Sequence, residues 1–474
     1  MLNKLSKALS SAVLGAVLVA APTITLAADT LSEIYQLALT NDPQLRAANA
    51  ALKAGKEAIP LARAGLLPRI SASVELSDSD GDTGSSRFLN FDGQSRPAGA
   101  FGDNDDETEF YSISIKQPLF DLPAWFTFKQ GYDLDQRAEA QFAADQQATI
   151  LRVTDAYFNV LRASENLITS LAEERAIGRQ LEQTKERFDV GLLPVTDVHE
   201  AQAAFDSASV NTLEARAALD IAFEGLEVLT GQPHNVLAGL AANFPVTQTE
   251  PADSASWVDF AQANNFGLKV AQLSTAAAEK NANAKKAEHL PTVSASLGYS
   301  NFHRDGHFVV DDTKEIQPFA EDDEPTVFSI RMDAPIFTGG LVSAERRRAF
   351  QEYIQAQENY LLAQRNITQQ ARSNHRKVQT DAARVKARNQ AITSAQSALE
   401  ATEAGYDVGT RNIVDVLISQ RTLYEAQRNY ANARYDYINS MLKLKEVAGQ
   451  LSPEDISQLD QWLDQKLEIS KAGS

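Results

Sequence analysis

Residue types that carry enzyme chemistry are scattered through this 474-residue chain and form no catalytic motif. The six histidines lie apart, and the sequence contains no HExxH, GxSxG or phosphate-binding loop. Cysteine is absent, which excludes disulfides, thiolate metal sites and cysteine nucleophiles. The stretch DSDGD at 78–82 lacks the glycine position and the terminal Glu of an EF-hand, and His303 and His307 lie where solvent exposure is the default. We therefore expect no enzyme, no cofactor and no specific metal site.

Two aspartates, eight residues apart, do recur in two segments more than 200 residues apart. FDVGLLPVTDV occupies 188–198 and YDVGTRNIVDV occupies 406–416, and five of the eleven positions are identical. A second pair, LPRISASVELS at 67–77 and LPTVSASLGYS at 290–300, shares six of eleven. Because the offsets, 218 and 223, nearly agree, we interpret the chain as an internal duplication in which one structural unit is used twice.

Charge and the N-terminal residues narrow the class of protein. Lys and Arg number 44 against 63 Asp and Glu, and the net charge of -19 disfavours nucleic acid as a partner, because phosphates need a basic surface. Residues 1–28 contain Lys4 and Lys7, then an apolar run and the small residues TLAA, which is the pattern of a secretory signal peptide. No later run of about 18 apolar residues follows, so we expect that the mature protein does not cross a membrane as a helix.

Two long proline-free stretches predict helices of unusual length. Proline is absent from 124–193 and from 336–452, and the apolar residues of the first stretch keep a helical period. A helix of about 65 residues would be about 100 Å long at 1.5 Å per residue. Each long helix is predicted to end at a DVG motif and to form an antiparallel hairpin with a shorter helix. The shorter helices are expected at 195–230 and 413–448, and each copy should begin with a helix, at 30–64 and 254–286. These helices are predicted to form a cylinder together.

Segments between the helices alternate apolar and polar residues with a period of two, as strands with one apolar face do. Ile70 and Val74 face one side of the first such segment, while Ser71 and Ser73 face the other. A soluble sandwich would show the same alternation in one isolated hairpin. These strands, however, are about ten residues long, enough to cross a bilayer in a tilted barrel, and aromatic residues gather at their ends.

Four strands cannot close a barrel alone, and open sheet edges are not tolerated in lipid, so several chains must share one barrel. Three chains would give twelve strands and leave a lumen, which the polar inner face favours. The acidic segments at 77–109 and 301–325 are expected as long irregular loops on the outer side. We divide the chain into the signal peptide 1–28, a first repeat 29–230, an equatorial linker 231–253, a second repeat 254–448 and a C-terminal equatorial or periplasmic segment 449–474.

This order of elements resembles the TolC family of outer-membrane channel-tunnels. The resemblance covers nearly all of the mature chain: an LPxxSAS strand, a strand that ends in PLF or PIF, a long helix, a DVG turn and a short helix, all present twice. It implies a mixed α and β membrane protein, a homotrimer whose twelve-stranded β-barrel, four strands per chain, lies in the cell outer membrane. The barrel would continue as a long α-helical coiled-coil tunnel through the periplasm.

The resemblance further implies a function. The protein would be the exit duct of tripartite efflux pumps or of type I secretion, and it would open at its periplasmic end. Its partners would be a periplasmic adaptor (membrane fusion protein), an inner-membrane pump or ABC transporter, and outer-membrane lipid. A periplasmic coiled-coil adaptor or structural protein is the alternative, although it would not need four alternating strands with aromatic ends. The outer loops could also serve as a receptor for phage or toxins.

The resemblance also assigns residues to the periplasmic end. The hairpin tips that meet the adaptor correspond to Val190, Gly191 and Leu192 in the first copy and to Val408, Gly409 and Thr410 in the second. The network that holds the entrance closed corresponds to Thr196 and Asp197 on the first hairpin and to Tyr406 and Arg411 on the second. A guanidinium and a carboxylate would form a directional contact that can break and form again. The alternatives are that the glycines only terminate helices and that Asp and Thr only cap them.

The entrance constriction of this family is lined by aspartates that form rings by threefold symmetry. The family pattern DVLD reads DVLI here, so Asp415 keeps the first ring while Ile418 stands in place of the second. Three carboxylates brought together attract cations, and the loss of one ring should weaken the preference for cations. In the internal alignment Glu200 lies at the position equivalent to Ile418. We therefore expect Glu200 to replace part of the missing ring.

Overall fold

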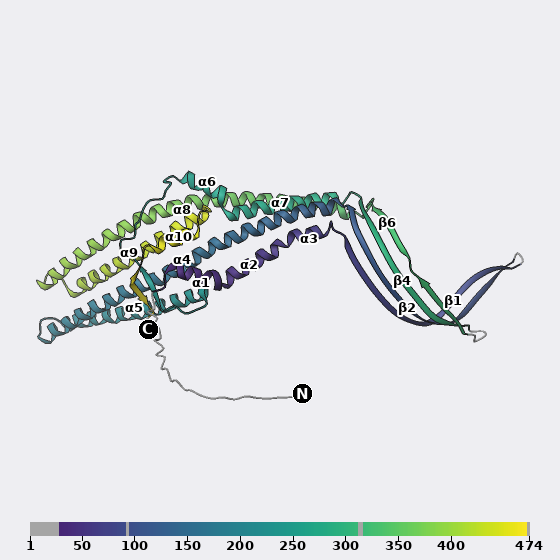
Figure 1. Ribbon diagram of the computed structural model, residues 1–474. Coiled ribbons are helices and arrows are strands. Elements are labelled where there is room, and N and C mark those ends of the chain that lie inside the picture. Colours follow the sequence, from purple (N-terminus) through teal and green to yellow (C-terminus); the bar gives the residue numbers. More distant parts are fainter. Residues whose placement is uncertain (1–27, 92–93, 311–315, 472–474) are drawn as a thin grey trace, which may run out of the picture.

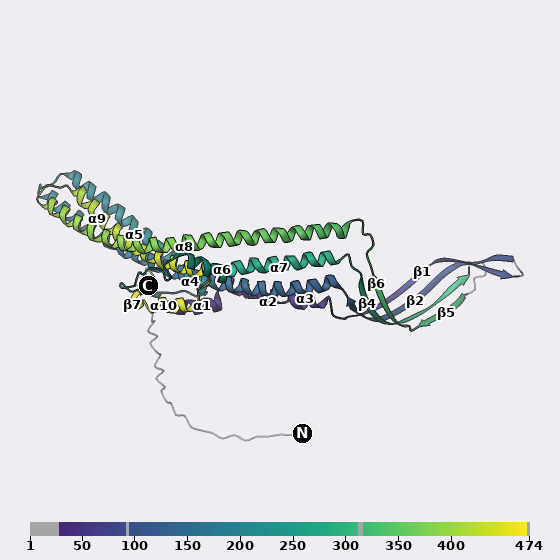
Figure 2. The same ribbon diagram turned by 90° about the horizontal axis from the view of Figure 1, so that it is seen from above.

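The computed structural model describes residues 28–91, 94–310 and 316–471. The predicted signal peptide lies outside the described residues, apart from Ala28. The described chain is elongated, with helices over most of its length and a curved sheet that extends from one end (Figures 1 and 2). Helices and sheet are therefore arranged end to end.

Two long helices run through the helical part and each is followed by a shorter one. α4 (Leu122–Asp189) has 68 residues and α8 (Leu341–Asp407) has 67, which corresponds to about 100 Å each at 1.5 Å per residue. α5 (Val195–Thr230) packs against α4, and α9 (Ile413–Val447) packs against α8. The two hairpins point away from the sheet (Figure 1), as the sequence predicts. None of the helices in the described ranges is both long enough and apolar enough to span a bilayer.

The prediction of one helix at 30–64 is wrong, because the helix is interrupted there at Asp42 and again at Glu57. The segment forms α1 (Leu31–Asn41), α2 (Pro43–Lys56) and α3 (Ala58–Ala64), all in contact with α4. Asp42 is extended, as a residue before proline tends to be, and its carboxylate accepts a hydrogen bond from the Gln44 N–H at 3.0 Å. The helix predicted at 254–286 is likewise divided at the extended Asn265, into α6 (Ser254–Asn264) and α7 (Phe266–Ala287).

The sheet has four strands side by side over most of its length and two strands at its far end. It contains β1 (Arg69–Phe91), β2 (Gln94–Phe120), β4 (Thr292–Val310), β5 (Ile316–Asp323) and β6 (Thr326–Asp333). β1 pairs with β2 and β2 pairs with β4, all antiparallel. β5 and β6 pair with different halves of β4, so together they serve as the fourth strand. The four-stranded unit predicted for one chain is therefore present.

The prediction of irregular loops at 77–109 and 301–325 is wrong. β1 and β2 stay paired from Arg69 opposite Lys116 to Phe91 opposite Gln94, and β4 and β5 are paired over most of the second segment. β1 has 23 residues and β2 has 27, so they also exceed the predicted length of about ten. Acidic residues are poor strand formers, but each added residue pair on a neighbouring strand extends the ladder of hydrogen bonds. Among the described residues these carboxylates form no group that could hold a metal ion.

The two faces of the sheet differ in polarity, as the alternation predicts. Ile70, on one face, is 68% exposed, and its large apolar neighbours on that face are exposed as well. On the other face, hydroxyl groups bond across strands: Ser71 Oγ lies 2.8 Å from Ser114 Oγ, and Ser296 Oγ lies 2.8 Å from Ser329 Oγ. An apolar face this extensive requires a neighbour other than water.

A small belt of structure surrounds the middle of the helices. It contains β3 (Val236–Leu240), β7 (Leu463–Ser470), which pairs with β3, and α10 (Pro453–Asp460). Asp29 forms a bridge to Leu237, and its carboxylate lies 2.7 Å from His234 Nδ1. The buried Tyr157 of α4 donates a hydrogen bond from Oη to the Ala238 C=O at 2.7 Å. The belt thus fastens both ends of the described chain to the middle of α4.

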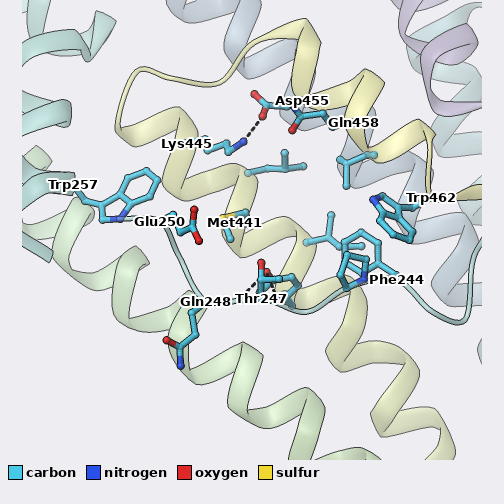
Figure 3. Close-up of a pocket in the computed structure, with 15 residues that line it drawn as sticks. Phe244, Thr247, Gln248, Glu250, Trp257, Met441, Lys445, Asp455, Gln458 and Trp462 are labelled. Atoms are coloured by element: carbon cyan, nitrogen blue, oxygen red, sulfur yellow. Dashed lines mark hydrogen bonds and ion pairs between the residues drawn. The ribbon is translucent and has the colours of Figure 1, made fainter. Parts of the chain in front are cut away.

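A cavity of about 500 Å³ lies in this belt, between the 241–253 segment, α9 and α10 (Figure 3). Phe244, Trp257 and Trp462 line it together with aliphatic side chains of α9. Lys445 and Asp455 form an ion pair at one edge of the cavity. Because these residues come from three separate segments, the cavity marks the place where the linker and the C-terminal part meet.

α4 and α9 are joined by an ion pair that is largely withdrawn from water. Arg428 Nη1 lies 2.6 Å from Glu173 Oε2, and the Glu173 side chain is 3% exposed. A carboxylate removed from water is costly unless a partner offsets the lost solvation. The pair therefore fixes α9 against α4, and neither partner can be removed alone without penalty.

Replacing Arg428 with Met should lower the free energy of unfolding by about 3 to 5 kcal/mol, because the Glu173 carboxylate would stay buried without its partner. The double variant Arg428→Met, Glu173→Leu should recover most of this loss, since it removes both charges. Denaturation of the purified protein, followed by circular dichroism, measures both effects. A single variant as stable as the wild type would contradict this account of the pair.

Candidate functional site

The first hairpin, from α4 to α5, turns at Gly191. The Gly191 N–H donates a hydrogen bond to the Phe188 C=O at 2.8 Å, and the Leu192 N–H donates one to the Arg187 C=O at 2.9 Å. Gly191 has a φ of 78°, in the left-handed region that other residues rarely adopt. This pair of bonds is a Schellman motif, which satisfies the last carbonyl groups of α4.

The second hairpin, from α8 to α9, repeats this turn bond for bond. Gly409 has a φ of 76°, and its N–H donates to the Tyr406 C=O at 3.0 Å. The Thr410 N–H donates to the Gly405 C=O at 2.8 Å. The interpretation that the glycines terminate the long helices is confirmed, and the duplication extends to individual hydrogen bonds.

The side chains beside the two glycines are open to solvent. Val190 is 71% exposed, Leu192 is 72% exposed and Val408 is 75% exposed. Apart from the adjacent residues in the chain, no atom of the described residues lies within 4 Å of the place where a Cβ on Gly191 or Gly409 would be. Apolar side chains gathered and exposed at the ends of two neighbouring hairpins are typical of a contact surface for another protein.

The alternative that Thr196 and Asp197 serve only as helix caps is wrong. The residue before α5 is Pro194, which offers no side-chain cap, and the Asp197 N–H donates to the Pro194 C=O at 3.2 Å. In the second hairpin, α9 is capped by Asn412, whose Oδ1 accepts a hydrogen bond from the Asp415 N–H at 2.9 Å. Neither Thr196 nor Asp197 therefore forms a capping hydrogen bond for α5.

Within one protomer the predicted network residues do not bond across the two hairpins. Thr196 Oγ1 donates to Asp197 Oδ1 at 3.3 Å, and Arg411 Nη1 lies 3.6 Å from Asp415 Oδ2 on its own helix. Tyr406 packs against the apolar cluster that joins α4, α5 and α9, but its buried Oη has no hydrogen-bond partner among the described residues. Bonds between the two sets would have to form between neighbouring protomers.

A contact that the sequence analysis missed does join the hairpins within the protomer. Arg187 Nη2, in the last turn of α4, lies 3.0 Å from Asp407 Oδ1 at the end of α8. The Arg187 guanidinium is also 5.2 Å from the centre of the Tyr406 ring, and its hydrogen bond to Asp407 raises the pKa of Arg187 above the usual value. The internal alignment gives no signal for this pair, because Arg187 aligns with Gly405. We call Arg187, Asp407 and Tyr406 the hairpin clasp.

The candidate constriction residues lie near the start of the two shorter helices. The side chain of Asp415 is 36% exposed, and Ile418, about one turn further along α9, is 56% exposed. Glu200 is exposed on α5 and forms no hydrogen bond or ion pair with any described residue. Asp197 and Glu200 therefore occupy the same depth on the first hairpin as Asp415 and Ile418 on the second.

Comparison with known proteins gives the family of the chain. The family model described as outer membrane efflux protein matches residues 34–232 and 257–450. The chain is 36% identical to the outer membrane protein TolC of Vibrio cholerae, over 92% of this chain and 94% of that protein. It is 33% identical to the outer membrane protein TolC of Escherichia coli, over 92% of this chain and 85% of that protein. It is 28% identical to the alkaline protease secretion protein AprF of Pseudomonas aeruginosa, over 89% of this chain and 85% of that protein.

Solved structures share the fold at lower sequence identity. A structure of CusC, described as forming a transmembrane channel, aligns with a TM-score of 0.72 at 16% identity and covers 89% of this chain and 92% of that chain. The outer membrane protein VceC of Vibrio cholerae aligns with a TM-score of 0.70 at 19% identity, and the alignment covers 88% of this chain and 96% of that chain. The family match and the TolC relatives lead to one conclusion: the chain belongs to the outer membrane efflux protein family.

Proposed function

We propose that three copies of this chain form a passive duct that carries molecules out through the outer membrane and opens at its hairpin tips. The observation that carries this proposal is the continuity of the sheet with the helices. A four-stranded sheet with one apolar face leads directly into helices of 68 and 67 residues, about 100 Å long. The sheet crosses the membrane, and the helices extend the passage through the periplasm.

The open edges of the sheet support the assembly of three chains. β1 forms one edge, and β5 with β6 forms the other. In lipid the unpaired backbone groups of such edges must find partners, so the sheet has to close on copies of itself. Three copies give a closed barrel with a lumen, whereas a barrel of two would be nearly filled by its own side chains.

Relatives of the chain are named for both efflux and secretion. They include AprF and the proteases secretion protein PrtF of Dickeya chrysanthemi, and also the outer membrane efflux protein BepC of Brucella suis. We infer that this chain works in the same way, with a periplasmic adaptor and an inner-membrane pump or ABC transporter. The exposed apolar tips, Val190 to Leu192 and Val408 to Thr410, supply the surface for the adaptor. A periplasmic adaptor or structural coiled coil is not favoured, because it has no use for the exposed apolar face of the sheet.

Two sets of contacts hold the entrance closed in this proposal. The hairpin clasp ties α4 to α8 inside each protomer. Thr196 and Asp197 of one protomer receive the Arg411 guanidinium of the next, since no such bond forms within the protomer. All of these side chains are at least partly exposed, so each contact is weak enough to be exchanged when an adaptor binds.

Arg187→Ala should increase the fraction of time for which the channel is open in planar bilayer recordings. An exposed ion pair contributes about 0.5 kcal/mol, so the loss of three pairs together shifts the equilibrium between the closed and open forms about tenfold. Arg175→Ala is the matched control, because Arg175 is an exposed residue of α4 whose one hydrogen bond among the described residues goes to the Leu171 C=O of its own helix. An open fraction that is the same in Arg187→Ala, Asp407→Asn and the wild type would show that the clasp does not gate.

Glu200→Gln should reduce the selectivity for cations and weaken the block by divalent cations added at the tip side. Its carboxylate has no hydrogen-bond or ion-pair partner in the described part of the protomer, so threefold symmetry would set three free charges around the entrance. The control is Glu224→Gln, on the same helix about 36 Å further from the tips. Unchanged selectivity and unchanged block in Glu200→Gln would rule out a second acidic ring formed by Glu200.

Val190→Asp together with Val408→Asp should abolish crosslinking to the adaptor in cells, because a charge would enter the apolar contact surface. Val190→Ile with Val408→Ile keeps the surface apolar and should crosslink as the wild type does. Both variants leave the glycine turns intact, so their trimers should be recovered in equal amounts. Equal crosslinking of the two double variants would show that the adaptor does not bind at the tips.

A further inference from the structure

Three basic residues gather on the polar face of the sheet, at the end that joins the helices. Arg69 of β1 is directly opposite Lys116 of β2, and Lys116 is opposite Ser296 of β4. Arg331 of β6 is opposite Ser294, which lies two residues from Ser296 and so faces the same way. We call Arg69, Lys116 and Arg331 the basic collar.

The basic collar lies on the lumen side of the barrel. Two residues further along β1 and β2, on the same face, Ser71 and Ser114 bond to each other at 2.8 Å. The residues between, Ile70 and Ile115, belong to the opposite, apolar face. Because the apolar face of an outer-membrane barrel contacts lipid, the face that carries the collar lines the passage.

The charge of the basic collar is not neutralised inside the protomer. All three side chains are exposed, and among the described residues none of them forms an ion pair. One carboxylate, Asp333, lies two residues from Arg331 on the same face. The three basic side chains and this carboxylate together leave a net positive charge on this part of the face. Further out on this face the arrangement is different, because Arg304 Nε lies 2.7 Å from Asp106 Oδ2.

Like charges opposite one another on neighbouring strands destabilise a sheet. Arg69 and Lys116 are direct cross-strand partners, a position in which Cβ atoms are about 5 Å apart. Arg69 also lies on one edge strand and Arg331 on the other, so closure of the barrel continues the basic collar from each protomer to the next. The repulsion is relieved when an anion binds between the cationic groups.

We propose that the basic collar is an anion-binding site that receives the carboxylate, phosphate or sulfonate groups of molecules in transit. The ligands are organic anions and polyanions. The collar lies at the opposite end of the helices from Asp415, so a molecule passes an acidic entrance first and a basic ring afterwards. This inference rests on the duct proposed above, but it is independent of the clasp and of the role of Glu200.

The test uses the purified trimer in a planar bilayer, with inorganic tripolyphosphate added on the barrel side. Tripolyphosphate should block the wild-type current reversibly. In the variant Arg69→Gln, Lys116→Gln, Arg331→Gln, block should need at least about tenfold more tripolyphosphate, since several charge pairs of about 1 kcal/mol each are lost. The zero-current potential measured in a KCl gradient should also shift in the direction that indicates greater selectivity for cations. In 1 M KCl the block should largely disappear, because charges are then screened over about 3 Å.

Matched variants separate the possible outcomes. Lys53→Gln, Lys269→Gln, Lys466→Gln removes the same charge from exposed sites outside the five-stranded sheet and should leave block unchanged. Lys116→Gln alone should weaken block partly, which keeps the test open if the triple variant does not fold. Equal block of the wild type and Lys116→Gln, or loss of block in Asp415→Asn, would overturn the basic collar as the site. Absence of any wild-type conductance would instead overturn the duct.

Discussion

Lipid requires every backbone N–H and C=O that enters it to find a partner within the protein. The sheet of this chain meets that requirement between its strands and fails at its two edges. One chain is therefore incomplete, and a closed barrel with a lumen arises only between copies. The same constraint explains why Ile70, at 68%, and Phe337, at 87%, are exposed in the single chain, where a water-soluble protein would bury them.

Contacts along the helices differ in strength according to what each region does. Away from the tips, Glu173 is 3% exposed and pairs with Arg428, and the belt of β3, β7 and α10 fastens the chain ends to α4. At the tips the clasp residues Arg187 and Asp407 are 40% and 66% exposed, so water competes for their charges. In the duct proposed above, strong contacts away from the tips and weak ones at the tips would confine the opening movement to the hairpin ends, where we expect the adaptor to bind.

The distribution of charge carries more information about transport than its total. A net charge of -19 describes an acidic protein, yet the polar face of the sheet begins with the basic collar and continues with a band of serines. Charge selection in a passage depends on the few groups that line its narrow or confined parts, since those are poorly screened by water. In the proposed duct, Asp415 at one end and the basic collar at the other would give a single passage two regions of opposite charge preference.

The sequence by itself determined the elements that depend on local pattern. The long proline-free helices, the two glycine turns and the two faces of each strand follow from spacing and residue type, and the structure confirms them. Only the tertiary structure decided what depends on residues far apart in the chain. Strand pairing extends β1 and β2 through acidic segments that look irregular alone, because a neighbouring strand supplies the hydrogen bonds. Arg187 contacts Asp407, 220 residues away in the chain, because the two hairpins lie side by side. The periodicity within one segment cannot predict such a contact.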